Sequence, residues 1–363
     1  MAHIAIDARI INSTTGRYVE RLVTYLQDID KTNQYTVLVR EKDKGFWKPR
    51  QENFKVMVAE FDQYSFAEQL GFLGLLNKLK ADLVHFGIVQ QPILYRGKKV
   101  TTFHDMTLLN TYNSDKNWFV YHAKQLVGRF VFKSIAHTND HIIAISENTK
   151  KEFVEFTGIP EEKVTVIYEA SDVQNGGVKK YDLPFRRYIM YVGAQSDYKN
   201  IKRLGDAHQK LLEKHPDLGL VLVGKKTPAH LNTEAYFNKK GYKNILFTDY
   251  VSDEELNWLY KHAAAYTFPS LMEGFGLPPL EAMGHGLPVV ASNVSCIPEI
   301  CGDAAYYFNP LDTDDIARAI DTVISDEKLQ VKLATAGYKQ VKKYSWEKMA
   351  EQTHAIYKQL LGQ

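Results

Sequence analysis

Two glutamates, Glu273 and Glu281, bracket small and rigid residues in the segment EGFGLPPLE. The apolar run AAYTFPS before this segment predicts a short buried strand, so Glu273 is expected just past a strand end. Pro278 and Pro279 suit the first turn of a helix, where a missing N–H costs no hydrogen bond. Glu281 is then expected in that first turn, one short loop away from Glu273.

The same segment favours a phosphate with hydroxyl groups on either side of it. Gly274 and Gly276 allow the backbone to approach a ligand closely. A helix start offers N–H groups and a partial positive charge, which suit an anion. Two carboxylates would repel the anion itself, so they suit hydroxyl groups, and a nucleotide sugar has this layout. The alternative is a solvated loop glutamate followed by a helix-start glutamate, but the complete segment favours the ligand.

The elements that must position these residues alternate between strand and helix in both halves of the chain. Short apolar runs are HIAIDARI, YTVLVR, DLVHF, KVTTFH, HIIAIS and VTVIY, then RYIMYVG, LGLVLVG, NILFTDY, AAYTFPS and LPVVAS. Segments with helical spacing, such as GRYVERLVTYLQDI, lie between them. This pattern predicts an α/β fold with two parallel sheets covered by helices. Ligands of such sheets bind beyond the carboxyl ends of the strands.

Composition sets the remaining bounds. A chain of 363 residues favours two domains, and 45% hydrophobic with 24% charged residues is ordinary for a soluble protein. A net charge of +2 gives no reason to expect a nucleic-acid partner. Cys296 and Cys301 lack the spacing of a metal site and are expected to be reduced, partly buried thiols of a cytoplasmic protein. We expect neither a signal peptide nor a transmembrane helix of ~20 apolar residues.

The chain resembles a known enzyme family. EGFGLPPLE resembles the E-x7-E signature of retaining glycosyltransferases of family 4 with the GT-B fold. DARIINSTTGRYVERL, TTFHDMTLL, IIAISENTKKEF and YVGAQSDYKNIKRL are similar to further stretches of that family. The resemblance implies two Rossmann-like domains that face each other across a cleft.

Four segments follow from the resemblance and from the break in pattern at SDVQNGGVKKYDLPFRR. Residues 1–172 are expected to form the N-terminal Rossmann-like domain on the acceptor side, and 173–186 the linker. Residues 187–345 are expected to form the C-terminal Rossmann-like domain on the nucleotide-sugar side. Residues 346–363 are expected to form a helix that crosses back to the N-terminal domain.

Roles for the segment EGFGLPPLE are implied by the same resemblance. Glu273 would hold hydroxyl groups of the donor sugar, as a catalytic residue, and Glu281 the ribose hydroxyl groups. The backbone N–H groups of Phe275, Gly276 and Leu277 would contact the sugar and the phosphates.

Three residues of the N-terminal half receive roles in the same way. Gly16 would pass close to the diphosphate, with a plain turn glycine as the alternative. His104 would face the transferred sugar as a catalytic residue, with a satisfied core histidine as the alternative. Asp105 would contact the donor or only orient its loop.

Cations for the diphosphate are expected after the first strand of the C-terminal half. The resemblance implies that Lys199 grips the phosphates and stabilises the charge that builds up on the departing group. Tyr198 stands where the family often has arginine, which removes one cation. Arg203 or Lys225 could help, but the favoured interpretation is that both are surface residues. Val251 would lie beside the nucleotide base.

We expect no metal and no cofactor beyond the nucleotide sugar, because cationic side chains and a helix start can do the work of a divalent ion. The acidic pairs in DID at 28–30 and DTD at 312–314 are interpreted as a helix end and a helix cap. GLVLVGKK lacks the Ser or Thr of a phosphate loop because Lys226 takes that position.

The implied function is transfer of a hexose from a nucleotide-diphosphate sugar to a hydroxyl of a glycan or lipid-linked glycan, with retention of configuration. The family impression favours mannose and GDP, as in polysaccharide biosynthesis for the cell envelope. The alternatives are a sugar-nucleotide epimerase of the same fold and a non-catalytic nucleotide-sugar-binding protein. An epimerase would act without an acceptor, and a binding protein would turn nothing over.

The acceptor is expected on the N-terminal domain. The segment NWFVYHAKQLVGRFVFK at 117–133 mixes aromatic and basic residues. One interpretation is a helix that packs its apolar face, and the other is an edge that meets a membrane surface or a lipid-linked glycan. The expected location is therefore cytoplasmic, with a peripheral position at the inner face of the membrane as the alternative.

Overall fold

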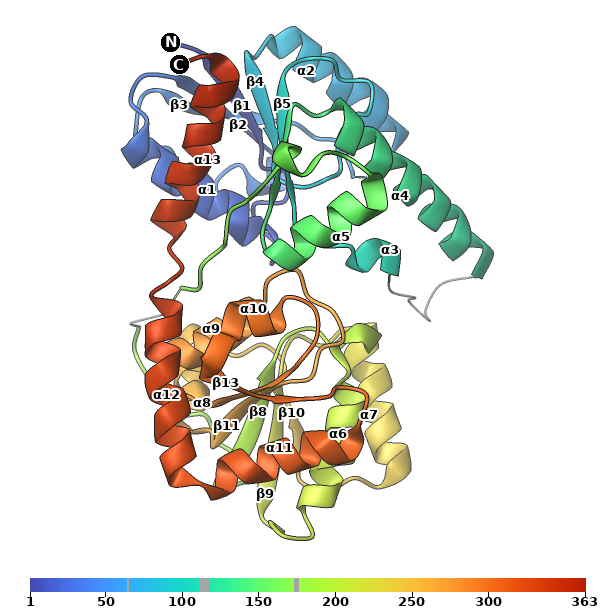
Figure 1. The fold of residues 1–363 in the computed structure, drawn as a ribbon, viewed down its shortest axis with the longest axis vertical. Coiled ribbons are helices and arrows are strands. Elements are labelled where there is room, and N and C mark those ends of the chain that lie inside the picture. The colour runs from blue at the N-terminus through green and yellow to red at the C-terminus, as the bar shows by residue number, and fades with distance from the viewer. Residues whose placement is uncertain (64, 111–117, 173–175) are drawn as a thin grey trace. The chain divides into compact units, whose positions relative to one another are not determined.

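The computed structural model describes residues 1–363 except 64, 111–117 and 173–175. It divides into two compact units, each built on its own sheet (Figure 1). The first unit holds the described residues among 1–110 and 116–169 together with residues 345–363. The second unit holds the described residues among 170–344. Residues 173–175 of the predicted linker, and residue 117 of the predicted acceptor segment, lie outside the described residues.

The sheet of the first unit has seven parallel strands in the order β3-β2-β1-β4-β5-β6-β7. The strands are β1 (His3–Asp7), β2 (Gln34–Val39), β3 (Phe54–Val58), β4 (Leu83–Phe86), β5 (Lys99–Phe103), β6 (His141–Ala144) and β7 (Val164–Val166). The central strands β1, β4 and β5 are buried along almost their whole length, as expected for a parallel sheet covered on both faces.

Helices of the first unit connect these strands. They are α1 (Gly16–Ile29), α2 (Leu73–Leu79), α3 (Thr107–Asn110), α4 (Trp118–Thr138) and α5 (Glu147–Thr157), with short turns η1 (Glu41–Asp43), η2 (Glu68–Phe72) and η3 (Glu161–Lys163). The last helix of the chain, α13 (Trp346–Leu361), packs against α1 in this unit (Figure 1). Its Tyr357 hydroxyl is hydrogen-bonded to Nδ1 of the buried His85, and Nε2 of His354 lies 3.0 Å from Oδ2 of Asp30.

The second unit has six parallel strands in the order β10-β9-β8-β11-β12-β13. They are β8 (Arg187–Val192), β9 (Leu218–Val223), β10 (Ile245–Phe247), β11 (Ala265–Phe268), β12 (Val289–Ser292) and β13 (Ala305–Phe308). The helices are α6 (Ile201–Leu211), α7 (Pro228–Lys240), α8 (Asp253–His262), α9 (Leu277–Gly284), α10 (Ile297–Cys301), α11 (Thr313–Ser325) and α12 (Glu327–Val341), with turns η4 (Asp197–Lys199) and η5 (Gly302–Ala304). The prediction of two parallel-sheet α/β domains is confirmed.

Each sheet has one point at which the strand order reverses. In the first unit β1 lies beside β4, and in the second unit β8 lies beside β11. Loops that leave such a pair of strands in opposite directions open a crevice at their carboxyl ends, where ligands of this kind of fold bind. The loops after β8 and β11 carry Lys199 and Glu273, so the topology brings these two residues to one edge of one sheet.

Among the described residues, no helix combines the length and the hydrophobicity needed to span a bilayer.

Candidate functional site

The loop before α9 has a backbone that requires glycine. Gly276 precedes the first helical residue, Leu277, and has φ 101°, which side chains other than hydrogen rarely tolerate. Pro278 and Pro279 follow inside the first turn and carry no N–H. The amide donors at this helix start are therefore confined to Leu277 and the residues before it.

The prediction that Glu281 lies in the first turn of this helix is wrong. Because α9 begins at Leu277, Glu281 is already in the second turn, and the first turn contains no acidic residue. The Glu281 carboxylate instead accepts a hydrogen bond from the hydroxyl of Tyr260 at 3.4 Å. Glu281 is therefore not placed to cap the start of α9.

Ser295 and Cys296, the two residues before α10, form hydrogen bonds to the backbone of the loop before α9. The Ser295 hydroxyl donates to the Glu273 carbonyl at 2.7 Å, and the Cys296 thiol lies 3.2 Å from the carbonyl oxygens of both Glu273 and Phe275. Burial raises the pKa of the Cys296 thiol well above its usual value, so that it remains a protonated donor. Both cysteines are buried and neither forms a disulfide.

Lys199 and Glu273 form an ion pair within the second unit. Nζ of Lys199 lies 2.6 Å from Oε1 of Glu273, and the two side chains are only 14% and 12% exposed. The ammonium group also lies 5.0 Å from the ring centre of Tyr198 and 5.8 Å from that of Phe268. Burial disfavours the charge of Lys199, but the Glu273 carboxylate outweighs this, and the pKa of Lys199 is raised.

This pair places a fixed cation and a hydrogen-bond acceptor side by side. Without a ligand, each group satisfies the charge of the other. A diphosphate would compete for the ammonium group, and a sugar hydroxyl would compete for the carboxylate, so one ligand with both groups could replace the pair. A cation held in this way can stabilise negative charge on a departing phosphate. Tyr198, which stands in the place of an expected arginine, contributes its ring to the ammonium group.

Lys199 pairs with a carboxylate, whereas Arg203 donates hydrogen bonds to uncharged oxygens of the protein. Nη1 of Arg203 donates to Oδ1 of Asn200 at 2.6 Å and to the carbonyl of Pro310 at 3.1 Å. These contacts fix the turn that begins α6 and occupy the guanidinium group with protein oxygens.

Val251 follows β10 and is 9% exposed. A cavity of about 340 Å³ between α6 and α7 includes Arg203 in its lining but neither Lys199 nor Glu273.

In the first unit, close backbone contacts explain why residue 16 is a glycine. A Cβ atom at this position would lie 1.8 Å from the carbonyl oxygen of Ile10 and 2.8 Å from the carbonyl carbon of Ile11. The hydroxyl of Ser13 accepts from the Gly16 N–H at 3.0 Å and donates to the Ile10 carbonyl at 2.7 Å. This folded-back loop excludes any side chain at Gly16, and its approach to a diphosphate stays a prediction.

His104 follows β5 and is held at both ring nitrogens. Nε2 lies 2.9 Å from the carbonyl oxygen of Gly87, and Nδ1 lies 3.2 Å from Oε1 of Glu169. Tyr18 packs its ring against the imidazole with centres 5.2 Å apart, nearly perpendicular. Burial alone would lower the pKa of His104, but the hydrogen bond and the charge of Glu169 outweigh burial and raise it.

Glu169 is a residue that the sequence reasoning missed. It comes shortly after β7, in the segment VTVIYEASD. A carboxylate just past a strand end is the same signal that singled out Glu273, and it could have identified Glu169 as well.

The Asp105 carboxylate accepts a hydrogen bond from the Thr107 N–H at 2.7 Å, a contact that orients the loop leading into α3.

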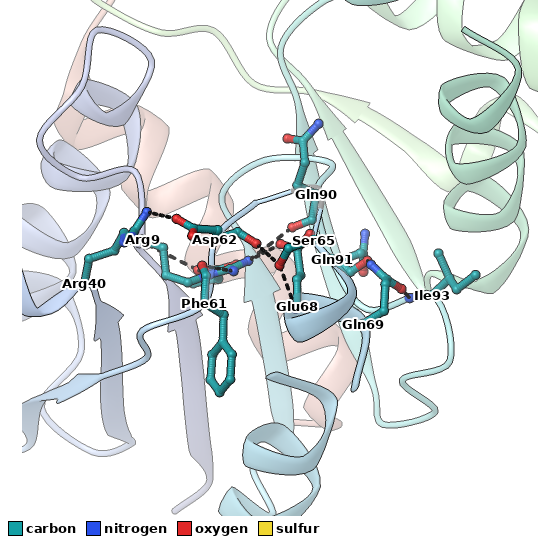
Figure 2. Close-up of polar contacts among 11 residues, drawn as sticks. Arg9, Arg40, Phe61, Asp62, Ser65, Glu68, Gln69, Gln90, Gln91 and Ile93 are labelled. Atoms are coloured by element: carbon teal, nitrogen blue, oxygen red, sulfur yellow. Dashed lines mark hydrogen bonds and ion pairs between the residues drawn. The ribbon is translucent and has the colours of Figure 1, made fainter. Parts of the chain in front are cut away.

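A second charged cluster that sequence reasoning missed lies after β1. Nη2 of Arg9 lies 2.8 Å from both Oδ2 of Asp7 and Oε1 of Glu68, and all three side chains are almost fully buried. Nη1 of Arg9 donates to the Phe61 carbonyl at 3.1 Å. Figure 2 shows how these contacts converge on the guanidinium group, with Gln69 bonded to the backbone of residues 91 and 93 nearby. The cluster ties Phe61 and Glu68 to the carboxyl end of the central strand β1.

The acidic pairs set aside as metal sites are engaged in other ways. Asp30 follows the last residue of α1 and accepts from Tyr35 at 2.8 Å. Asp312 caps α11 by accepting from the backbone N–H groups of Asp314 and Asp315. Both interpretations, a helix end and a helix cap, are confirmed. Within the part of the chain that the structure describes, no group of three His, Cys, Asp or Glu residues is placed to hold a metal ion.

Comparisons with known proteins agree along most of the chain. The family model "Glycosyl transferases group 1" matches residues 180–340, and "Glycosyltransferase Family 4" matches residues 15–175. An O-antigen chain mannosyltransferase of Escherichia coli is 32% identical over 279 residues, covering 72% of this chain and 71% of the relative. A serotype-specific mannosyltransferase of Escherichia coli is 31% identical over 278 residues, covering 70% of this chain but only 32% of that relative.

The backbone is similar to solved structures as well. Sucrose-phosphate synthase from Thermosynechococcus elongatus superimposes with a TM-score of 0.78 at 18% identity and covers all of both chains. At that identity the likeness speaks for the fold and for nothing finer.

Proposed function

The chain belongs to glycosyltransferase family 4 with the GT-B fold, and from that premise we propose that it moves a mannose residue from a nucleotide-diphosphate sugar to a hydroxyl of a glycan or lipid-linked glycan with retention of configuration. The enzyme is a hexosyltransferase that uses a nucleotide sugar. The observation that carries the proposal is the buried Lys199–Glu273 pair in front of α9, because it offers a cation and an acceptor to one ligand.

In this proposal the donor lies along the loop before α9. Lys199 and the N–H groups of Phe275, Gly276 and Leu277 hold the diphosphate and the adjoining sugar. Glu273 accepts from hydroxyl groups of the transferred sugar, and Glu281 from hydroxyl groups of the ribose. Because Ser295 and Cys296 hold the backbone of this loop, these groups are fixed before the ligand arrives. Such preorganisation reduces the cost of binding and of reaction.

The chemical step breaks the bond between the sugar C1 and a phosphate oxygen. The nucleoside diphosphate leaves with the bonding electrons, and Lys199 stabilises the negative charge. The acceptor hydroxyl forms the new bond to C1 from the same face, and its proton passes to the departing phosphate oxygen, which accounts for retention. No side chain is assigned as a covalent nucleophile. We propose that this step needs no metal ion, because Lys199 supplies positive charge beside the diphosphate.

Mannose is favoured by the relatives. Two curated relatives that match about 70% of the chain are mannosyltransferases, one of them described for O-antigen chains. The proposed biological setting is therefore polysaccharide synthesis for the cell envelope. GDP as the nucleotide follows only from the preference for mannose.

A donor screen tests the proposal. Purified enzyme is incubated with GDP-mannose, UDP-glucose, UDP-galactose, ADP-glucose or dTDP-glucose and a mannan-type oligosaccharide acceptor, and both released nucleotide and extended glycan are measured. Transfer from GDP-mannose with an α-linked product from the α-linked donor is expected. Glu273→Ala should reduce transfer to background while GDP affinity changes little. Glu213→Ala, at an exposed residue of the same unit, is the matched control and should keep full activity.

Three results would contradict the proposal or its assignment of Glu273. Conversion of the donor sugar without an acceptor would identify an epimerase. Tight nucleotide-sugar binding with no turnover under any donor and acceptor combination would identify a binding protein. Equal turnover by Glu273→Ala and wild type would remove the assignment of this carboxylate.

The acceptor is proposed to bind the first unit, close to α4. One face of α4 buries Phe132, Ile135 and Ala136 in the core, as one of the two interpretations predicts. Leu126, Val127 and Phe130 on the same helix are 71%, 62% and 64% exposed. This exposed apolar strip supports a peripheral contact with a membrane surface or a lipid-linked acceptor at the inner face of the membrane.

Sedimentation with vesicles tests that contact. The protein is spun with vesicles that contain about one third anionic phospholipid, and the bound fraction is measured. Wild type is expected in the pellet, and a variant with Leu126→Ser and Phe130→Ser is expected in the supernatant. Wild type that stays in the supernatant at low salt would contradict the membrane contact.

A further inference from the structure

The contact between the His104 ring and the Glu169 carboxylate indicates a role for Glu169. We propose that Glu169 is a positioning residue for sugar transfer, whose carboxylate holds His104 as a doubly protonated imidazolium ring in one fixed orientation. This inference rests on the proposed function and on the prediction from the family resemblance that His104 faces the transferred sugar. Glu169 acts only through His104 and is not itself in contact with the donor.

The hydrogen-bond geometry leads to the doubly protonated ring. The Gly87 carbonyl can only accept, so Nε2 of His104, at 2.9 Å, must carry a hydrogen. An ionised Glu169 can also only accept, so Nδ1, at 3.2 Å, must carry one as well. A neutral imidazole has a single N–H and would leave one of these two contacts unsatisfied. The imidazolium form satisfies both.

The surroundings favour the pair. His104 and Glu169 are 13% and 7% exposed, so water screens their attraction poorly. Two residues of other elements act on the ring of His104. The phenol ring of Tyr18 packs against it, and the buried imidazole of His85 interacts with it electrostatically. Burial, together with the charge of His104, lowers the pKa of His85 to about 3, so His85 stays neutral. Asp105, next to His104 in the chain, adds a second negative charge that favours the imidazolium form.

The position of Glu169 gives the pair a defined place in the fold. Glu169 is the last residue of the first unit before the chain passes, after β7, into the second unit; residues 345–363 return to the first unit later. His104 follows β5, and Gly87 follows β4. Three segments at the carboxyl edge of one sheet therefore converge on a single ring. Held at both nitrogens, the ring cannot flip, and the positive charge stays at the edge where ligands of this fold bind.

A consequence for the reaction follows. An imidazolium ring cannot accept a proton, so His104 does not act as the base for the acceptor hydroxyl. The proton of that hydroxyl passes to the departing phosphate oxygen, and His104 contributes a fixed positive charge on the side of the transferred sugar. Activity should accordingly fall as the pH rises through the pKa of His104, because the neutral ring loses both the charge and the contact with Glu169.

NMR titration of the full-length protein tests the pair without any substrate. Imidazole resonances are followed from pH 5 to 9, and His104→Asn identifies the resonance of His104 by its loss. The wild-type midpoint is expected above 6.5, the ordinary value. Glu169→Gln keeps the shape of the side chain but removes its charge, and should move the midpoint down. Glu60→Gln, at a glutamate of the same unit whose carboxylate is bonded to Arg40, is the control and should leave the midpoint unchanged.

The pH dependence of turnover tests the link to the reaction. Glu169→Gln should lose about tenfold in kcat near pH 7.5, as expected for the loss of a charge-assisted hydrogen bond, and should recover at lower pH where the ring is protonated again. Glu169→Asp keeps the charge and should retain a raised midpoint and more activity than Glu169→Gln. KM for the acceptor should change little, because Glu169 does not contact it.

Three results would overturn the proposal. Equal titration midpoints in wild type and Glu169→Gln would show that the carboxylate does not hold the charge of the ring. A shifted midpoint with an unchanged pH profile of kcat would reduce Glu169 to a structural role. Absence of transfer by wild type with every donor would overturn the proposed function and the catalytic part of this inference with it, whereas the titration would still report on the pair.

Discussion

Gly16 opens α1 at a point where the preceding loop folds back onto the helix start. The Ile10 carbonyl oxygen lies 1.8 Å from where a Cβ atom would stand, and that oxygen belongs to the backbone and cannot rotate away. Gly16→Ala should therefore lower the free energy of unfolding of the first unit by about 3 kcal/mol or more, at the upper end of overpacking costs. Urea denaturation followed by circular dichroism measures the loss.

Gly74 supplies the control for that experiment. It lies in α2 of the same unit, and a Cβ atom there would meet nothing within 4 Å. Gly74→Ala should raise stability by about 0.5 kcal/mol, because alanine restricts the unfolded chain more than glycine does. Equal effects of the two substitutions would mean that the loop before Gly16 adapts to a side chain at little cost.

Residues at strand ends could be predicted because an alternating α/β pattern marks each end in the sequence. Lys199, Glu273 and His104 were found by the family resemblance together with that marker, and the structure brings Lys199 and Glu273 into contact. The partner of His104 was missed because the last strand of the N-terminal half was used only to mark a boundary. Glu281 was predicted in the first helical turn and lies in the second. The error arose because nothing in LPPLE shows whether the first of the two prolines occupies the first or the second helical position.

Among the elements, α13 depends on contacts that no local pattern reveals. Its Tyr357 is fully buried and bonded to Nδ1 of His85, a residue 272 positions earlier in the chain. Nε2 of His85 in turn lies 2.8 Å from the Thr102 hydroxyl, which also contacts the hydroxyl of Tyr18 at 2.8 Å. This buried network joins the last helix to β4, β5 and α1. The family resemblance predicted a helix at residues 346–363 that crosses back to the N-terminal domain, but not the residues to which it bonds.

Tyr357→Phe tests how strongly this network holds α13. The substitution keeps the ring and leaves a buried nitrogen of His85 without its partner, which should cost about 1–3 kcal/mol of unfolding free energy. Hydrogen exchange should report faster opening of α13 amides than in wild type. Tyr338→Phe, at a half-exposed tyrosine of α12, should change stability by less than about 0.5 kcal/mol. Unchanged exchange in α13 would show that its apolar contacts with α1 suffice.

At the scale of the whole molecule, the chain is organised as two sheets, and the residues with proposed roles are divided between them. Lys199, Glu273 and Glu281 belong to the second unit, whereas His104, Glu169 and Gly16 belong to the first. The sequence predicted two α/β domains because parallel strands buried on both faces read as continuous apolar runs. The return of residues 345–363 to the first unit was expected only from the family resemblance, since it joins the two ends of the chain.

This division predicts where and how a nucleotide binds. GDP should bind to wild type in calorimetry with equal affinity in magnesium and in EDTA, within about twofold, because the ammonium group of Lys199 supplies the charge that a divalent ion would otherwise bring. Lys199→Met should weaken GDP binding by about tenfold or more, in line with the loss of a charge-assisted hydrogen bond. Lys239→Met, at an exposed lysine of α7, is the matched control and should bind like wild type. UDP, ADP and dTDP run in parallel establish the base. Binding that requires magnesium, or a Lys199→Met variant with wild-type affinity, would contradict this account of the diphosphate site, because the cation would then come from elsewhere.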